Sequence, residues 1–163
     1  KGKTVTVIGG GNSAIEESIY LSDIAEKVNI IVRRDVLRAD QYLVDKLKQK
    51  ENIEIHFLKK PYSIEVTDQK VTGLVVSDSK TEELSTITTQ GIFPFIGLDP
   101  ITDFVKNLDI IDEYGYILVD ENQETKVSGV FAAGDVTSKQ LRQVVTATND
   151  GAIAGQYIAS LLK

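Results

Sequence analysis

The feature that most constrains the fold of this chain is a triple-glycine turn, Gly9-Gly10-Gly11, which separates a strand-like run from a helix-like one. Thr4–Ile8, before the turn, is rich in β-forming residues. A second apolar run of strand length, Val28–Val32, follows the helix-like segment. Such a βαβ unit predicts a parallel sheet with a right-handed crossover. The helix is indicated by apolar side chains at helical spacing, at Ala14, Ile15, Ile19 and Ile24.

The next stretch of the chain predicts a helix and then a change from helical to alternating period. Asp40 can cap a helix that runs to Lys50. Apolar and polar residues then alternate over Ile53–Phe57, which predicts a strand. Three further strand-like runs are joined by polar turns, and we expect them to form an antiparallel meander inserted after the parallel unit. These runs are Tyr62–Val66, Val71–Val76 and Leu84–Thr88.

The second part of the chain follows the apolar run Gly91–Gly97. We place a domain boundary there, so that residues 1–95 form one domain and residues 96–163 belong to another. The mixture of strands and helices places the chain in the α/β class. In the second part we expect a short helix near Thr102–Asn107, strands at Tyr116–Val119 and Val130–Ala133, and a long helix from about Leu141 to Leu162.

The charge and composition of the chain argue against several classes of function. A formal net charge of −6 argues against binding to nucleic acid or to an anionic membrane. No apolar run approaches the roughly 20 residues that span a bilayer, and no signal peptide precedes the first strand, so we expect a cytoplasmic protein. The chain contains no Cys and no Met. This composition excludes thiol chemistry and thiolate metal sites in the chain itself, and we expect a piece of a longer protein.

The glycine-rich turn matches the pattern Gly9-x-Gly11-x-x-Ala14. In this pattern the first Gly permits a tight turn, the second lets a pyrophosphate approach the backbone, and Ala14 allows close packing of helix on strand. The start of the helix offers unpaired N–H groups and a partial positive charge, to which Asn12 or Ser13 can add a side-chain hydrogen bond. The position within a βαβ unit favours dinucleotide binding over the alternative, a glycine-rich turn without a ligand.

Three arginines after the second strand indicate which dinucleotide binds. An NAD site usually has an acidic residue here that binds the ribose 2′-hydroxyl, whereas this sequence has Arg33, Arg34 and Arg38. Guanidinium groups so close together repel one another, and a 2′-phosphate bound by their forked donors would relieve that repulsion. We therefore predict NADPH in preference to NADH. The alternative is a solvated charge run in which Asp35 is the local partner.

A third motif, Gly129–Val136, ends in Gly134-Asp135-Val136 and precedes the last helix. A strand that ends in Gly-Asp puts a carboxylate at the carboxyl edge of a sheet, where ligands bind in open α/β folds. Asp135 can accept hydrogen bonds from a ribityl hydroxyl, and Arg142 and Gln143 can donate toward a flavin ring. The alternative is an ordinary strand–turn–helix connection without a ligand.

Over essentially its whole length, the sequence resembles the low-molecular-weight bacterial-type thioredoxin reductases. The resemblance implies a Rossmann-like NADPH-binding domain with an inserted antiparallel meander, followed by the C-terminal part of a second, FAD-binding Rossmann-like domain. The N-terminal part of that FAD domain and the family's Cys-x-x-Cys would precede Lys1, so we expect the chain alone to be inactive. The motifs that carry the resemblance are GGGNSAIEE, RRDVLRA, FIGLDP, and GVFAAGDV followed by RQVVTATNDGAIA.

The resemblance also implies roles for individual residues, although the position before Arg33, often His in the family, is Val32 here. Glu16 would approach the nicotinamide amide. The NADPH pyrophosphate would be held by Gly9, Gly11, Asn12, Ser13 and Ala14, and the 2′-phosphate by Arg33, Arg34 and Arg38. FAD would face Asp135, Arg142, Gln143 and Val144.

In such enzymes a hydride passes from NADPH to FAD, and the electrons then reduce a Cys-x-x-Cys disulfide and finally thioredoxin, the protein substrate. The resemblance therefore implies part of an NADPH-dependent thioredoxin-disulfide reductase, which we expect to act as a homodimer. Two alternatives remain open. One is a ferredoxin (or flavodoxin) NADP reductase of the same fold, and the other is a non-catalytic NADPH-binding module.

Overall fold

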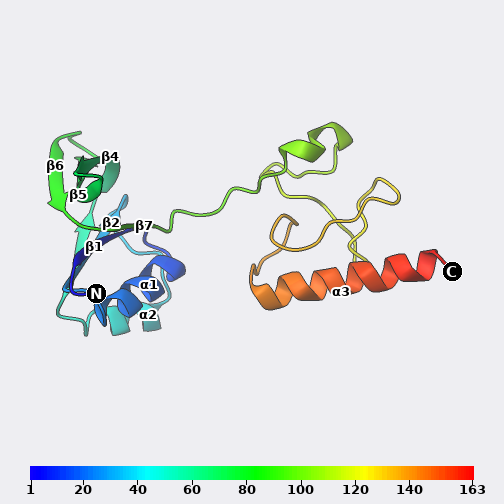
Figure 1. Cartoon of the computed structure of the whole chain (residues 1–163), viewed down its shortest axis with the longest axis horizontal. Helices are drawn as coiled ribbons and strands as arrows, with labels where there is room; N and C mark the ends of the chain where they lie inside the picture. The colour runs from blue at the N-terminus through cyan, green and yellow to red at the C-terminus, as the bar shows by residue number, and fades with distance from the viewer. The chain divides into compact units, whose positions relative to one another are not determined.

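A computed structural model of the chain describes residues 1–163 and contains two compact units, Lys1–Gly97 and Leu98–Lys163. The first unit holds all the regular strands, and the second holds one long helix with irregular loops (Figure 1). Each unit has its own cluster of buried apolar side chains.

A four-stranded parallel sheet forms the centre of the first unit. Its strands stand in the order β3-β2-β1-β7, and every neighbouring pair is parallel. Val7 in the middle of β1 faces Ile30 on one side and Phe93 on the other. The predicted βαβ unit is confirmed, and β7 extends the sheet on the far side of β1. The strands are β1 (Thr4–Ile8), β2 (Lys27–Val32), β3 (Ile53–Phe57) and β7 (Ile92–Pro94).

Two helices cover one face of this sheet, α1 (Asn12–Ser22) and α2 (Gln41–Leu47). Alternate strand residues point toward the helices because successive side chains of a strand lie on opposite faces. The resulting core is the largest in the molecule, and it fixes where α1 begins relative to the end of β1. Its fully buried members are Val7, Ala14, Ile15, Leu21, Val28, Ile30, Val32, Leu43 and Leu47.

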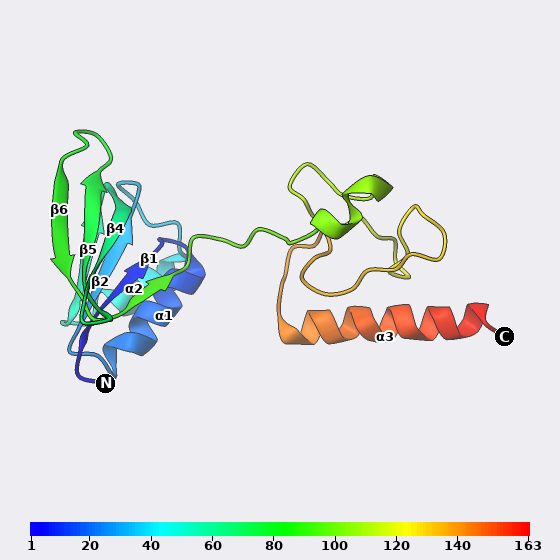
Figure 2. The ribbon, with the colours of Figure 1, turned by 45° about the horizontal axis from the view of Figure 1, so that its top comes forward.

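A three-stranded antiparallel sheet covers the opposite face, as Figure 2 shows. Strands β4 (Lys59–Thr67), β5 (Lys70–Asp78) and β6 (Leu84–Thr88) follow one another as a meander. Leu74 and Val76 of β5 are buried against Ile8 and Ile31 of the parallel sheet. The predicted inserted meander is therefore confirmed, and the first unit has the mixed α/β architecture expected of it.

The second unit contains a 3₁₀-helix, η1 (Asp103–Leu108), and a long helix, α3 (Val144–Leu161). The prediction of strands at Tyr116–Val119 and Val130–Ala133 was wrong, because these stretches form only isolated bridges, at Ile117 and Phe131. The carboxylate of Asp120 accepts hydrogen bonds from the N–H groups of Asn122 and Glu124. Such local turns compete with a strand ladder and keep the pairing short.

Large apolar side chains are exposed on the second unit. Val144 and Leu162, near the two ends of α3, are 81% and 82% exposed, and Phe104 of η1 is 73% exposed. Exposed apolar surface of this kind is typical of a face that packs against another segment or another molecule. No helix of the chain combines the length and the apolar character that crossing a membrane requires.

Candidate functional site

The candidate site lies at the carboxyl edge of the parallel sheet, where three neighbouring strands end. The Gly9–Gly11 turn follows β1, Arg33 and Arg34 follow β2, and Phe95–Gly97 follows β7. The chain runs outward from β1 through β2 to β3, and β7 then joins the other side of β1. Open α/β sheets bind ligands where the strand order reverses in this way. A cavity of about 680 Å³ lies here and is lined by all three segments.

Gly9 is at a position that no other residue type fits. Its φ is +145°, a backbone conformation that side chains disfavour, and a Cβ built on it would lie 2.3 Å from the carbonyl oxygen of Phe95. Phe95 is held in place because its N–H donates to the carbonyl of Ile8 (2.7 Å). The first glycine of the motif is therefore needed for the close approach of the β7 segment to the turn.

Gly11 leaves open space beside the start of α1. A Cβ at Gly11 would have no atom within 4 Å, although the residue lines the cavity. The first bond of the helix runs from the Ile15 N–H to the Gly11 carbonyl (3.1 Å), and no side chain caps the helix. The N–H groups of residues 12–14 therefore have no helical acceptor. Together with the helix dipole they form a site suited to a phosphate group.

Asn12 has a role in the structure that the sequence did not reveal. Its side-chain amide donates to Asp40 Oδ2 (2.9 Å), and its Oδ1 accepts the N–H of Asp40 (2.8 Å). Asp40 is the N-cap residue of α2, as expected, but its carboxylate is bound to Asn12 and makes no capping bond, and the helix ends at Leu47 rather than at Lys50. Asn12 thus ties the glycine turn to the start of α2, while its own N–H is available at the start of α1.

The three arginines lie on the segment after β2, and all three line the cavity. They are exposed, and neither Asp35 nor any other carboxylate forms an ion pair with them. The backbone holds this segment in place, since the N–H of Arg38 donates to the Gly10 carbonyl (2.7 Å). The arrangement favours the anion-binding interpretation over the solvated charge run, because Asp35, the expected local partner, forms no ion pair with the arginines.

One part of the cavity wall was not predicted from the sequence, and one predicted site residue lies outside the wall. Lys59, Lys60 and Pro61, at the start of β4, line the cavity together with the arginines. The available signal was the pair of lysines that begins two residues after the end of β3. Glu16, expected near a nicotinamide, is exposed on α1 and is not among the residues that line the cavity.

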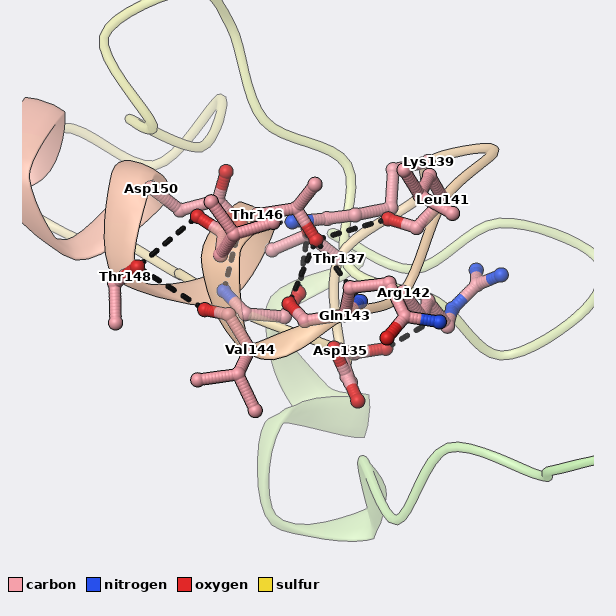
Figure 3. A network of polar contacts seen from close by, with 12 residues as sticks. Asp135, Thr137, Lys139, Leu141, Arg142, Gln143, Val144, Thr146, Thr148 and Asp150 are labelled. Carbon is pink, nitrogen blue, oxygen red and sulfur yellow. Dashed lines mark hydrogen bonds and ion pairs between the residues drawn. The ribbon is translucent and has the colours of Figure 1, made fainter.

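In the second unit, the residues expected to face a flavin lie around the start of α3 (Figure 3). The Nε atom of Arg142 donates to the backbone carbonyl of Asp135 (3.3 Å). The Arg142 guanidinium also lies 3.9 Å from the centre of the Tyr116 ring, within the range of a cation–π contact. Arg142 therefore has a defined position, and the exposed Asp135 side chain is free to accept hydrogen bonds from a ligand.

The first residues of α3 complete this group. Gln143 is the N-cap residue, and its N–H donates to Thr146 Oγ1 (3.0 Å). Val144 begins the helix and is almost fully exposed. The structure thus brings Asp135 and Arg142 into contact and places Gln143 and Val144 next to them in the chain, at the N-terminal end of an 18-residue helix.

A buried ion pair holds the Gly134-Asp135 turn against α3. Asp150, on the second turn of α3, is 7% exposed; its Oδ2 accepts the Gly134 N–H (2.9 Å) and forms an ion pair with Lys139 (Figure 3). Burial raises the pKa of the Asp150 carboxyl, but the hydrogen bonds from Lys139 and from the Gly134 N–H outweigh it and leave the pKa below its ordinary value. The ion pair could not be predicted from the sequence: Asp150 lies within the motif that begins at Arg142 but Lys139 lies outside it, and no local pattern indicates that the two side chains meet.

Comparison with known proteins agrees with the fold and the motifs. The profile of the pyridine nucleotide-disulphide oxidoreductases matches residues 1–151. The thioredoxin reductase of Bacillus subtilis (strain 168) is 44% identical over 158 residues, which make up 97% of this chain and 50% of that protein. The thioredoxin reductase of Ureaplasma parvum is 43% identical over 158 residues, 96% of this chain and 51% of that protein. This chain spans about half the length of these curated relatives.

Solved structures give the same result. The crystal structure of Lactococcus lactis thioredoxin reductase superposes with a TM-score of 0.84 at 39% identity, covering 98% of this chain and 53% of that one. The structure of T. acidophilum thioredoxin reductase gives a TM-score of 0.81 at 38% identity, covering 99% of this chain and 54% of that one. The resemblance inferred from the sequence motifs is confirmed, and the chain belongs to the pyridine nucleotide-disulphide oxidoreductase family.

Proposed function

We propose that this chain is the NADPH-binding part of a flavoprotein disulfide reductase that reduces thioredoxin. The observation that carries the proposal is the cavity at the carboxyl edge of the parallel sheet. Its lining residues include the glycine turn, the uncapped start of α1 and five basic side chains, but no acidic one. A dinucleotide with an additional phosphate matches this combination of an anion-binding helix end and unpaired guanidinium groups.

The residues of the first unit suit the two ends of the adenosine half of NADPH. The pyrophosphate fits against Gly9, Gly11 and the N–H groups of Asn12, Ser13 and Ala14, where Gly11 leaves space for it. The 2′-phosphate fits among Arg33, Arg34 and Arg38. NADPH, when bound, supplies the hydride of the reaction. We also propose that Glu16 contacts the nicotinamide amide. Glu16 does not line the cavity, so the nicotinamide end of NADPH would extend beyond it.

In the second unit, Asp135, Arg142, Gln143 and Val144 are the residues that we propose to face FAD. Residues 1–95 would then be the NADPH-binding domain, and residues 96–163 would contribute to the FAD-binding domain. The exposed carboxylate of Asp135 and the start of α3 suit hydroxyl and anionic groups. Thioredoxin is the proposed protein substrate, because the relatives are thioredoxin reductases. No observation favours a ferredoxin reductase or a non-catalytic module over this function.

We also propose a cytoplasmic homodimer. The exposed apolar residues at both ends of α3 and on η1 support association with a second copy. Sedimentation equilibrium of the isolated chain should show species heavier than 17.9 kDa. A single species of that mass at every protein concentration would contradict the dimer.

Titration calorimetry with NADPH and NADH tests the cofactor proposal. The wild-type chain should bind NADPH more tightly than NADH, because the arginines form charge-assisted hydrogen bonds only with the 2′-phosphate. Arg33→Ala or Arg34→Ala should weaken NADPH binding by about tenfold or more, since each such contact contributes roughly 1.5–3 kcal/mol. Neither change should affect NADH to the same degree.

Arg142→Ala is the matched control, because Arg142 is the one arginine outside the first unit. It should leave the affinities for both dinucleotides unchanged in the isolated chain. Equal affinities of the wild-type chain for NADPH and NADH would contradict the proposed cofactor. If Arg33→Ala weakened the binding of NADPH and NADH equally, Arg33 would not be a contact to the 2′-phosphate.

A further inference from the structure

The antiparallel insertion contributes to the wall of the cavity, although it lies outside the βαβ unit. Strand β4 begins at Lys59, directly after the left-handed residue Leu58, whose φ is +57°. Lys59, Lys60 and Pro61 all line the cavity. Two cationic side chains from a separate sheet therefore face the same space as the arginines of the segment after β2.

Backbone hydrogen bonds fix these lysines relative to the arginines. The N–H of Leu58 donates to the Arg34 carbonyl (3.2 Å), and the hydroxyl of Ser79 donates to the Arg33 carbonyl (3.1 Å). The N–H of Ser79 in turn donates to the Leu58 carbonyl (2.7 Å). These three bonds join the start of β4, the end of β5 and the arginine segment. The backbone therefore sets the position of the lysines relative to the arginines.

The two lysines differ in their electrostatic surroundings. Lys59 Nζ lies 3.1 Å from Asp78 Oδ2 and forms an ion pair with it. The N–H groups of Lys80 and Thr81 also donate to Asp78 and, together with Lys59, hold the pKa of that carboxyl well below its usual range. Asp78 therefore stays ionised and compensates the charge of Lys59. Lys60 is exposed and forms no ion pair.

We propose that Lys60 is a further specificity-determining residue, a fourth cation that binds the 2′-phosphate of the dinucleotide beside Arg33 and Arg34. Of the two lysines that line the cavity, Lys60 is the one that forms no ion pair with a carboxylate of the chain. Its anchoring to the arginine segment, rather than to the glycine turn, assigns it to the 2′-phosphate and not to the pyrophosphate. The inference rests on the proposed binding of NADPH in this cavity and adds a contact from outside the βαβ unit.

The test is calorimetric titration of the full chain with NADPH and with NADH, in the wild type and four variants: Lys60→Ala, Lys60→Arg, Lys70→Ala and Arg33→Ala. Lys60→Ala should weaken NADPH binding about three- to tenfold, because one exposed charge-assisted contact is lost. Its effect on NADH should stay within about twofold, because NADH has no phosphate at that position. Lys60→Arg retains a cation and should preserve most of the preference for NADPH.

Lys70→Ala is the matched control. Lys70 is exposed at the far end of the same hairpin, where β4 and β5 are joined, and it does not line the cavity. It should change neither affinity, which separates a local contact from the general loss of one positive charge. Circular dichroism of each variant should match the wild type, because both lysines are exposed.

The outcomes separate this inference from the proposed function. If wild type prefers NADPH and Arg33→Ala removes that preference while Lys60→Ala does not, the role of Lys60 is refuted and the cofactor proposal stands. Equal losses of NADPH and NADH affinity in Lys60→Ala would also refute it. A wild-type chain that does not prefer NADPH overturns both.

Discussion

Replacing Asp150 with Ala is expected to lower the free energy of unfolding of the second unit by about 3–5 kcal/mol. The change leaves Lys139, whose side chain is 16% exposed, as a largely buried charge without a partner. It also removes the acceptor of the buried Gly134 N–H. Hydrogen exchange of the α3 amides at a fixed protein concentration measures the loss, and the amides of the first unit should keep their protection.

Two further variants test whether loss of the Asp150–Lys139 ion pair causes the expected destabilisation of the second unit. Asp150→Asn keeps an acceptor for Gly134 but not the charge, so it should destabilise the unit less than Asp150→Ala does. Lys126→Ala removes a partner of Asp109 in an ion pair that is exposed on both sides, and it should leave protection nearly unchanged. Equal protection of α3 in Asp150→Ala and in the wild type would contradict the assigned role of the pair.

The effect of Asp150 should also depend on pH. Because its pKa in the folded unit is lowered, the ionised carboxylate contributes stability that is complete above its unfolded pKa, about 3.9. That contribution is lost as the pH falls through the lower, folded value. The difference in stability between wild type and Asp150→Ala should therefore be largest at neutral pH and narrow below about pH 4.

Replacing Gly9 with Ala is the second change for which we expect a large effect. The new Cβ would lie 2.3 Å from the Phe95 carbonyl oxygen, a backbone atom that cannot move without separating β7 from β1. The φ of +145° adds strain for any residue with a side chain. Together these effects should destabilise the first unit by about 3–5 kcal/mol, as urea unfolding would measure, and binding of NADPH should be lost with the shape of the turn.

Gly11→Ala separates folding from binding at the same turn. Gly11 has a φ of −95°, which any residue adopts, and its Cβ would meet no atom within 4 Å. The variant should therefore unfold at nearly the wild-type urea concentration. It should nevertheless bind NADPH at least about tenfold more weakly, because the methyl group occupies space that the pyrophosphate needs. Unchanged NADPH affinity in a folded Gly11→Ala would show that the ligand does not approach this part of the turn.

The elements of the first unit could be predicted from the sequence because their signals are local. The change from strand to helix at Gly9–Gly11 and the alternation over Ile53–Phe57 follow from side-chain periodicity within a few residues. In the second unit the same reasoning failed at Tyr116–Val119 and Val130–Ala133. Apolar runs of strand length become strands only where a neighbour offers a continuous ladder, and here the backbone pairs at single residues.

Only some of the residues that form the site could be predicted from the sequence, because only local patterns can be recognised in it. The glycine motif and the arginine run each lie within one short segment, so the sequence by itself determined the residue types at the start of α1 and after β2. Contacts between distant residues depend on the path of the chain. Asn12 meets Asp40 28 positions away, and Asp150 meets Gly134 across 16 positions.

Tertiary structure alone decided which side chains share the cavity with these motifs. Lys60 follows β3 in sequence and belongs to a different sheet, yet the bonds from Leu58 and Ser79 to the arginine segment bring its strand to the cavity. The pairing of Lys59 with Asp78 then leaves Lys60 as the lysine with an uncompensated charge. A sequence lists the charges of a chain, but only the folded backbone determines which of them neutralise one another and which remain available to a ligand.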